Sequence, residues 1–340
     1  MKRIFGYIFL ALYFAVAVWA VAVEFVPSVD GQCEVAEQVQ DVEVELVFVG
    51  DVMAHMPQVE AAQVGPERYD FGPHFAPVAP LFQVADYVVA NLETTLSPRP
   101  PYGGYPAFAT PDRLARDLAA AGIDFVTLAN NHIVDRGAEG VLHTIAALDN
   151  VGIGHSGASV ESLCQGNLGG RVVAVDGLRV ALLAYTYGVN GRVPEDAQVS
   201  LLTQSRVAHD VAQLPDDVDV VVALVHWGNE YQRTPSSQQV AAAEWMRQLG
   251  VDVIVGSHPH VVQPFEGWSD ESGRGVGGVY YSLGNFISNQ NDRYTDFGLA
   301  ARVRLSRREG ELSVSLSADT LYRHRYTLDG RQYFRVSPVR

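Results

Sequence analysis

The sequence predicts an α/β fold in which two sheets form a sandwich flanked by helices, preceded by a transmembrane helix. From residue 44 onward, short apolar strands alternate with helical segments. The strand run Val44–Val49 is nearly all apolar, which is typical of sheets covered by helices on their faces. The C-terminal stretch Leu312–Val336 is rich in strand patterns, which favours a second sheet packed on the first over a single doubly wound sheet.

The N-terminus predicts a membrane segment. Lys2 and Arg3 precede an apolar run over residues 4–25, and about 20 apolar residues are needed to cross a bilayer as a helix. The next basic residue is Arg68, so the charge bias keeps the N-terminus in the cytoplasm and the rest of the chain outside. We therefore expect residues 1–26 to be a single-pass anchor in the cell membrane. A cleaved signal peptide stays open, because Ala20-Val21-Ala22 resembles a small-x-small site.

Residues 27–43 are expected to form an acidic linker. They contain Pro27, Ser28, Gly31 and five carboxylates, with little apolar periodicity. The domain is then residues 44–340, on the extracytoplasmic side.

The remaining elements follow in order. Thr110-Pro111 predicts a helix N-cap with proline at the first helical position, and Gly122 ends that helix. Further helices are expected at 138–150, 201–214 and from Ser236 or Ser237 to Gly250. Strands are expected at 44–49, 86–90, 123–128, 171–175, 180–187, 218–225, 251–255, 279–283 and 299–305.

The charge of the chain excludes one class of partner. The net charge is −15 and Lys2 is the only lysine, whereas nucleic-acid binding needs clustered basic side chains. A polyanionic ligand would have to be held by local arginines or by metal ions.

Polar side chains recur where five predicted strands end. Because ligands bind beyond the carboxyl ends of strands in α/β sheets, we expect these groups to gather. Their nitrogen and oxygen ligands suit Mn, Zn, Fe or Mg, so one or two divalent ions are expected. Each residue alone has a simpler explanation as a turn, a solvated acid or a core histidine; only the recurrence favours a metal site. The residues are Asp51, Glu93, Asn131 with His132, His226, and His258 with His260.

The motifs around these residues resemble the CapA family of bacterial capsule-synthesis and poly-γ-glutamate proteins, within the metallophosphoesterase superfamily. The resemblance spans about residues 45–295. Its main motifs are Val49-Gly50-Asp51-Val52-Met53, Ala90-Asn91-Leu92-Glu93-Thr94, Ala129-Asn130-Asn131-His132, Val225-His226-Trp227-Gly228 and His258-Pro259-His260.

The resemblance implies roles for individual residues. Glu93 would bridge two metals, with Asn131, His226 and His258 at one and Asp51 and His260 at the other. His132 would be the general acid and Asp135 would orient it. Met53 stands where the superfamily has a histidine, so His55 is a candidate additional ligand and a mononuclear centre stays open. Candidate substrate-binding residues are Arg136, Trp227 and Asn285, although surface exposure, core packing and a simple turn are the respective alternatives.

The function implied is that of a membrane-anchored capsule or exopolymer biosynthesis protein with a metal-dependent, hydrolase-like site. Its partner would be an anionic polymer such as poly-γ-glutamate. Two alternatives remain open: an exported metal-dependent phosphoesterase, and a non-catalytic scaffold that contacts the subunits of a membrane synthase.

Overall fold

The computed structural model describes residues 26–27, 33–34, 41–161 and 168–339. The chain divides into two compact units, Met1–Val39 and Gln40–Arg340. In the first, β1 (Val26–Pro27) pairs antiparallel with β2 (Cys33–Glu34). None of the helices in the described ranges is both long and apolar enough to cross a membrane. Apart from Val26, the predicted anchor lies outside the described residues.

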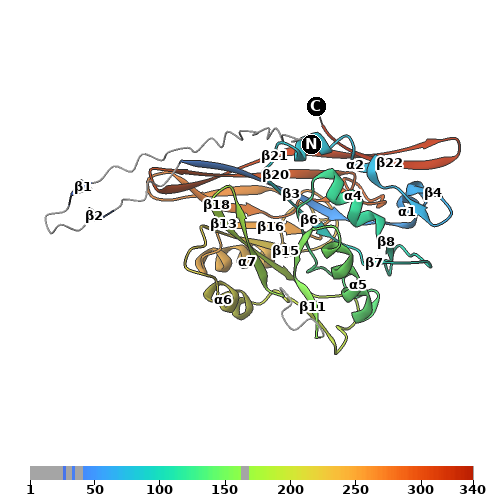
Figure 1. Ribbon diagram of the computed structural model, residues 1–340, viewed down its shortest axis with the longest axis horizontal. Helices are drawn as coiled ribbons and strands as arrows, with labels where there is room; N and C mark the ends of the chain where they lie inside the picture. Colours follow the sequence, from blue (N-terminus) through green and yellow to red (C-terminus); the bar gives the residue numbers. More distant parts are fainter. Residues whose placement is uncertain (1–25, 28–32, 35–40, 162–167, 340) are drawn as a thin grey trace, which may run out of the picture. The chain divides into compact units, whose positions relative to one another are not determined.

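The second unit contains a larger sheet with the strand order β10-β9-β6-β3-β20-β21-β22, and β19 also pairs with β3. Figure 1 labels β3, β6, β20, β21 and β22 of this sheet. The strands from β10 to β3 run parallel, whereas β20, β21 and β22 pair antiparallel. The bounds are β3 (Val42–Val52), β6 (Tyr87–Leu92), β9 (Phe125–Thr127), β10 (Gly154–Ser156), β19 (Asn285–Ile287), β20 (Phe297–Arg308), β21 (Glu311–Leu328) and β22 (Arg331–Pro338).

The smaller sheet has the order β12-β13-β15-β16-β18-β17 and is parallel in its interior. Its first two strands form the predicted hairpin, in which Asp176 and Gly177 both have positive φ, as a two-residue β-turn of this type requires. The bounds are β12 (Gly170–Val175), β13 (Leu178–Thr186), β15 (Val220–His226), β16 (Val253–Ser257), β17 (Phe265–Ser269) and β18 (Gly275–Tyr280).

Alternation along the strands builds the layers. On β3, Leu46 and Phe48 point into a core shared with β13, β15 and β16, which joins the two sheets. Val47 and Val49 point the other way, into a core formed with the helices on the outer face of the larger sheet. A third core lies between the smaller sheet and two helices and includes the fully buried Met246. The predicted two-sheet sandwich flanked by helices is confirmed.

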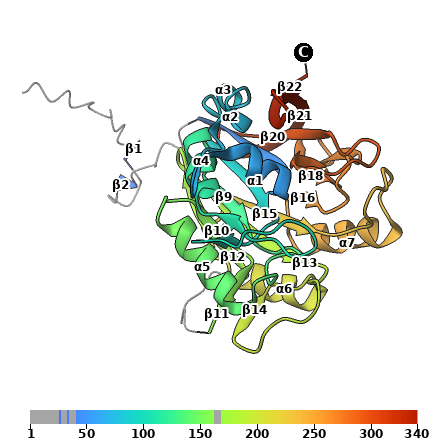
Figure 2. The ribbon, with the colours of Figure 1, turned by 90° about the vertical axis from the view of Figure 1, so that its right-hand side faces the viewer.

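The helices cover both outer faces. Figure 2 shows α6 and α7 along one side of the domain and α2 and α3 at the opposite side. The bounds are α1 (Met56–Ala62), α2 (Gly72–Phe75), α3 (Ala79–Phe82), α4 (Arg113–Ala121), α5 (Gly137–Asp149), α6 (Gln204–Ala212) and α7 (Ser237–Gln248). Short strands fill the loops: β4 (Gln63–Gly65), β5 (Arg68–Tyr69), β7 (Leu96–Ser97), β8 (Thr110–Pro111), β11 (Ala158–Val160) and β14 (Ala197–Val199).

Helix starts were predicted with mixed success. Ser236 caps α7 with a full capping box, because its hydroxyl accepts from the N–H of Gln239 while the Gln239 side chain accepts from the N–H of Ser236. The prediction that Thr110 caps α4 is wrong. Thr110 and Pro111 belong to β8, where the Thr110 hydroxyl bonds that of Thr94, and the helix begins after Asp112.

Candidate metal centre

The carboxyl ends of parallel strands from both sheets converge on one buried cluster. Asp51 lies near the end of β3 and Glu93 directly follows β6, whereas His226 ends β15 in the other sheet. His258 and His260 follow β16. None of the five is more than 4% exposed, so the sheet sandwich carries this polar group inside the protein.

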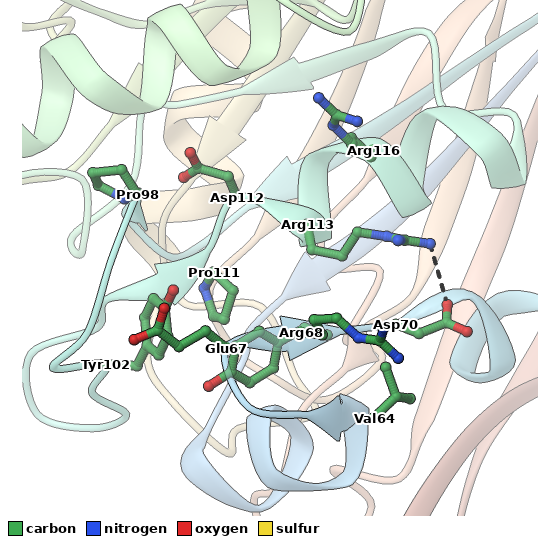
Figure 3. Close-up of a pocket in the computed structure, with 11 residues that line it drawn as sticks. Val64, Glu67, Arg68, Asp70, Pro98, Tyr102, Pro111, Asp112, Arg113 and Arg116 are labelled. Atoms are coloured by element: carbon green, nitrogen blue, oxygen red, sulfur yellow. Dashed lines mark hydrogen bonds and ion pairs between the residues drawn. The ribbon is translucent and has the colours of Figure 1, made fainter.

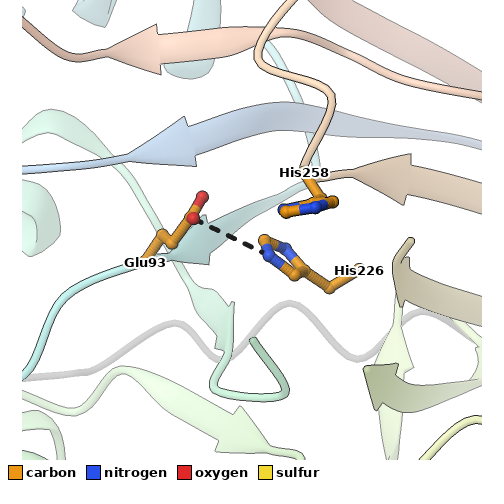
Figure 4. A group of neighbouring side chains, drawn as sticks. All are labelled: Glu93, His226 and His258. Atoms are coloured by element: carbon orange, nitrogen blue, oxygen red, sulfur yellow. Dashed lines mark ion pairs between the residues drawn. The ribbon is translucent and has the colours of Figure 1, made fainter. Parts of the chain in front are cut away.

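Three sets of side chains bring their ligand atoms within 4.8 Å of one another. The first is Glu93, His226 and His258, which point toward a common centre in Figure 4. The second is Asp51, Glu93 and His260, so Glu93 belongs to both. The third is Glu230, His258 and His260. The cluster therefore brings together residues that could hold one or two metal ions. Glu93 belongs to two of the three sets.

The carboxylate of Glu93 is buried without compensation from the protein. Neither of its oxygens has a hydrogen-bond partner, and the nearest imidazole nitrogens are Nε2 of His226 at 3.7 Å and Nε2 of His260 at 3.8 Å from Oε1. Burial and then the neighbouring Asp51 carboxylate raise the pKa of Glu93 well above its usual value. A buried acid in this position is what a cation would stabilise, so the donor set fits a divalent metal ion.

Two histidines of the cluster, His226 and His258, are held neutral. Burial, followed by the neighbouring histidines His258 and His260, lowers the pKa of His226 well below its usual value. Burial and then His260 lower the pKa of His258 to about 3. A neutral imidazole offers a lone pair to a metal ion, and Nδ1 of His258 is buried without a hydrogen-bond partner.

The turn after β16 carries backbone strain. His258 has φ of 93° and His260 has φ of 57°, conformations that residues with a side chain seldom adopt. Strain of this kind persists where the surrounding structure requires a particular side-chain direction. Here it directs the two rings, whose centroids are 5.7 Å apart, toward the carboxylates of the larger sheet.

Asp51 is oriented by two neighbours. Its Oδ1 accepts from Nδ2 of Asn91 at 2.7 Å, and its Oδ2 lies 3.0 Å from Nδ1 of His260. Asn91 also lies 3.2 Å from Nδ1 of His226, so it links the carboxylate of one sheet to an imidazole of the other. Sequence reasoning did not single out Asn91 as a site residue; its parallel pairing with Asp51 in the sheet is the feature that places it there.

Asn131 and Glu230 complete the surroundings. Oδ1 of Asn131 lies 3.0 Å from Nε2 of His226, as expected for a residue that follows β9. Glu230, which lies in the loop after β15, was missed because an exposed acid in a loop has no distinguishing pattern. Its spacing of four residues after His226 was the available signal.

His132 forms a buried pair beside the cluster. Its Nδ1 lies 2.8 Å from Oδ2 of Asp135, and the same oxygen accepts from the backbone N–H of Phe108 at 2.7 Å. The ring of Phe108 meets that of His132 edge-on, with centroids 4.7 Å apart. Asn190, not foreseen from the sequence, places its amide 3.4 Å from the His132 ring.

Comparison with known proteins identifies the family. The family model described as "Bacterial capsule synthesis protein PGA_cap" matches residues 45–290, which is most of the described domain. The chain belongs to the PGA_cap family. The resemblance to CapA proteins stated from the motifs is thereby confirmed.

Relatives of this PGA_cap chain carry matching names. "Capsule biosynthesis protein CapA" of Bacillus anthracis is 31% identical over 264 residues, which cover 72% of this chain and 60% of that protein. "PGA biosynthesis protein CapA" of Bacillus subtilis (strain 168) is 27% identical over 263 residues, or 72% of this chain and 63% of that protein. This chain thus covers less than two thirds of either relative. The 5'-nucleotidase of Candida albicans SC5314 superposes with a TM-score of 0.45 at 12% identity, over 81% of this chain and 51% of that one.

Four further residues singled out in the PGA_cap sequence lie near the centre. His55 is outside the ligand sets found among the described residues; its Nδ1 accepts from the N–H of Asn289 at 3.2 Å. Arg136 donates to the carbonyls of Phe108 and Ala107 at 3.0 and 2.7 Å. It therefore holds the loop that supports His132.

Trp227 and Asn285 are both buried. Trp227 is 2% exposed and donates its indole N–H to the carbonyl of Tyr281 at 2.9 Å, which favours core packing over groove lining. Asn285 is also 2% exposed; its amide donates to the carbonyl of His260 at 3.3 Å and to Oε1 of Gln290 at 2.8 Å. It therefore braces the histidine turn.

A cavity of about 570 Å³ lies apart from the cluster, and no metal-site candidate lines it (Figure 3). Its arginines are balanced by acids: Arg113 lies 3.5 Å from Asp70 and 2.7 Å from Asp117. Glu67 and Asp112 also line it, so this cavity does not favour anions by charge.

Proposed function

We propose that this PGA_cap protein takes part in capsule or exopolymer biosynthesis by acting, through a divalent metal centre, on an anionic polymer of the poly-γ-glutamate type. The observation that carries the proposal is the unpaired Glu93 carboxylate, buried beside the neutral His226 and His258 at the meeting point of the two sheets. The names of the relatives, which refer to capsule and PGA biosynthesis, support the substrate class.

The residues that would hold metal are Glu93, His226 and His258 in one set and Asp51, Glu93 and His260 in the other. Glu230 adjoins the two C-terminal histidines as a further candidate. A bound divalent ion would supply Lewis-acid activation of water and neutralise charge that develops on a carbonyl oxygen. Asn131 and Asn91 hold His226, so they fix the direction of one ligand.

His132 is proposed as the general acid. The carboxylate of Asp135 faces Nδ1, which leaves Nε2 as the nitrogen that gives a proton to a leaving amine. The Phe108 N–H and the Arg136 guanidinium keep Asp135 and its loop in place. In this role Asp135 and its neighbours orient His132, while the metal cluster binds the part of the substrate that reacts.

The test is hydrolysis of purified poly-γ-glutamate by the full-length chain with Mn or Zn, followed by chromatography of the products. The proposal expects shorter γ-linked fragments from the wild type and none from His258→Ala. Turnover of phosphate esters but not of the polymer would instead support an exported phosphoesterase. Polymer binding with bound metal but without turnover would support a scaffold.

We also propose that residues 1–26 anchor the domain at the outer face of the cell membrane, from the apolar run and its flanking charges. Fractionation of cells that express the full-length chain with a C-terminal tag tests this. An anchor predicts a membrane-bound, full-mass protein whose tag is cut by external protease. A shortened, released protein would indicate a signal peptide.

A further inference from the structure

Two arginines of β21 lie near the metal cluster without an ion-pair partner among the described residues. On the neighbouring strand β20, Arg302, Arg304 and Arg307 each form ion pairs with acidic side chains. Arg323 and Arg325, in contrast, form no ion pair with any carboxylate of the described residues. Because they are two residues apart on a strand, both side chains leave the same face of the sheet.

Arg323 is buried with its donors mostly unused. It is 5% exposed, its Nε has no hydrogen-bond partner, and one of its terminal nitrogens donates to the carbonyl of Gln290 at 3.0 Å. Burial, followed by the charge of Arg325, lowers its pKa. A buried guanidinium with so little compensation is costly unless an anion reaches it.

A cavity of about 390 Å³ opens at these two arginines. Its charged lining is three arginines and two acids, since Arg293 adds to the pair while Asp292 and Asp296 oppose it. Arg293 lies over the ring of Tyr294, with 4.6 Å between the guanidinium carbon and the ring centroid. The remaining partners of Arg325 are the neutral amides of Asn289 and Asn291. The cavity therefore keeps a positive balance in a chain that is strongly acidic.

The cavity is connected to the metal cluster by direct contacts. Asn289, which Arg325 contacts, donates its backbone N–H to His55. Gln290, which Arg323 contacts, bonds the side chain of Asn285, and Asn285 in turn bonds the carbonyl of His260. The amide of Gln290 also lies 3.3 Å from the hydroxyl of Tyr231, whose ring faces that of His260.

We propose that Arg323 and Arg325 form a carboxylate-binding subsite that holds an acidic group of the polymer while a neighbouring unit reaches the metal cluster. The planar guanidinium presents paired N–H donors that match a carboxylate. This inference rests on the proposed function for its substrate class, but the subsite lies on β21, beyond the residues matched by the family model. The subsite would determine which polymer chains bind and would take no part in the chemical step.

The test is calorimetric titration of the full-length chain, in detergent and with Mn, with a short oligomer of γ-linked glutamate. Arg325→Gln carries the test because its side chain is exposed, whereas Arg323→Gln changes a buried group and is checked for folding by circular dichroism. Arg335→Gln is the matched control: it removes the same charge from β22 at a position that contacts the Tyr326 hydroxyl and does not line the cavity.

We expect each cavity variant to weaken oligomer binding roughly 10-fold or more, as for loss of a hydrogen bond to a charged group, with Arg335→Gln unchanged. Metal content, measured on the same samples, is expected to stay at the wild-type value. Equal oligomer affinity in wild type and Arg325→Gln would overturn the subsite while leaving the metal centre intact. Arginine-dependent binding of inorganic phosphate without binding of the oligomer would overturn the carboxylate assignment. A chain without metal whose oligomer binding still depends on Arg325 would support the subsite and reject the proposed chemistry.

Discussion

Nε2 of His226 lies 3.7 Å from Oε1 of Glu93, and neither oxygen of that carboxylate accepts a hydrogen bond. The two residues come from different sheets, so their approach depends on the whole sandwich. An acid in this setting destabilises the metal-free protein and becomes favourable when a cation binds.

Replacement of Glu93 by glutamine is expected to raise the stability of the metal-free protein. The amide is neutral, so the folded protein neither buries a charge nor takes up a proton at this position, while the shape of the side chain is kept. The variant should lose the stabilisation by added metal, which for the wild type is about 2.7 kcal/mol at a metal concentration 100 times Kd. Thermal unfolding with EDTA and with Mn measures both effects. A variant that is less stable than wild type in EDTA and still gains from Mn would contradict this.

Gly50 precedes Asp51 for a steric reason. A Cβ at position 50 would lie 1.8 Å from the carbonyl oxygen of Gly284, and that carbonyl accepts the N–H of Asp51 at 3.1 Å. Gly50→Ala should therefore cost about 1–3 kcal/mol and weaken metal binding by shifting Asp51. Gly188→Ala is the control, because nothing lies within 4 Å of its Cβ. Urea unfolding measures the loss of stability in each variant, and metal titration measures the loss of metal affinity. Equal losses in Gly50→Ala and Gly188→Ala would refute the steric account.

The two sheets and most residues of the metal cluster could be predicted from the sequence. Apolar runs predicted the strands, and polar residues at their ends pointed to Asp51, Glu93 and His226 because parallel strands end at one edge. The sequence could not predict that β3 continues to Val52, since Gly50 and the buried Asp51 interrupt the apolar pattern there. The Thr110 cap failed because tertiary pairing with β7 outweighed local preference.

Residues placed by loops were the least predictable. Glu230, Asn190 and Arg323 approach the site through turns or through a strand that is distant in sequence. Apart from the spacing of Glu230 four residues after His226, nothing in their local pattern distinguishes them from surface residues. Trp227 was predicted to bind substrate because it lies in a motif. Its indole N–H instead donates to the carbonyl of Tyr281, which places it in the core.

Asp135→Asn is expected to lower kcat on the polymer by about 10²–10⁴-fold with little change in metal content. The amide oxygen can still accept from the Phe108 N–H, but the carboxylate that faces Nδ1 of His132 and orients its ring is lost. His143→Asn is the control, since it breaks a comparable pair with Asp112 that is half-exposed. Steady-state kinetics on the polymer provide the measurement. Retained kcat in Asp135→Asn would show that Asp135 does not orient the proton donor.

His74 is expected to make the fold sensitive to acid. Burial lowers its pKa to about 4 from 6.5. Between these values the unfolded chain binds more protons than the folded one, so the free energy of unfolding falls as pH falls from 6.5 toward 4, by roughly 3 kcal/mol at most. His74→Phe places a ring among Phe71, Phe75 and Phe334 and should reduce this loss. Urea unfolding of the wild type and the variant near pH 7 and near pH 4 measures this loss. If the free energy of unfolding falls by the same amount in both proteins, His74 does not contribute to it.

Metal content tests the central claim most directly. The full-length wild type and His258→Ala are equilibrated with Mn and Zn, desalted and measured by elemental analysis. The structure predicts one or two ions per chain in the wild type, from the two ligand sets that share Glu93, and fewer in the variant. A folded wild type that retains no ion from either metal would contradict the metal centre.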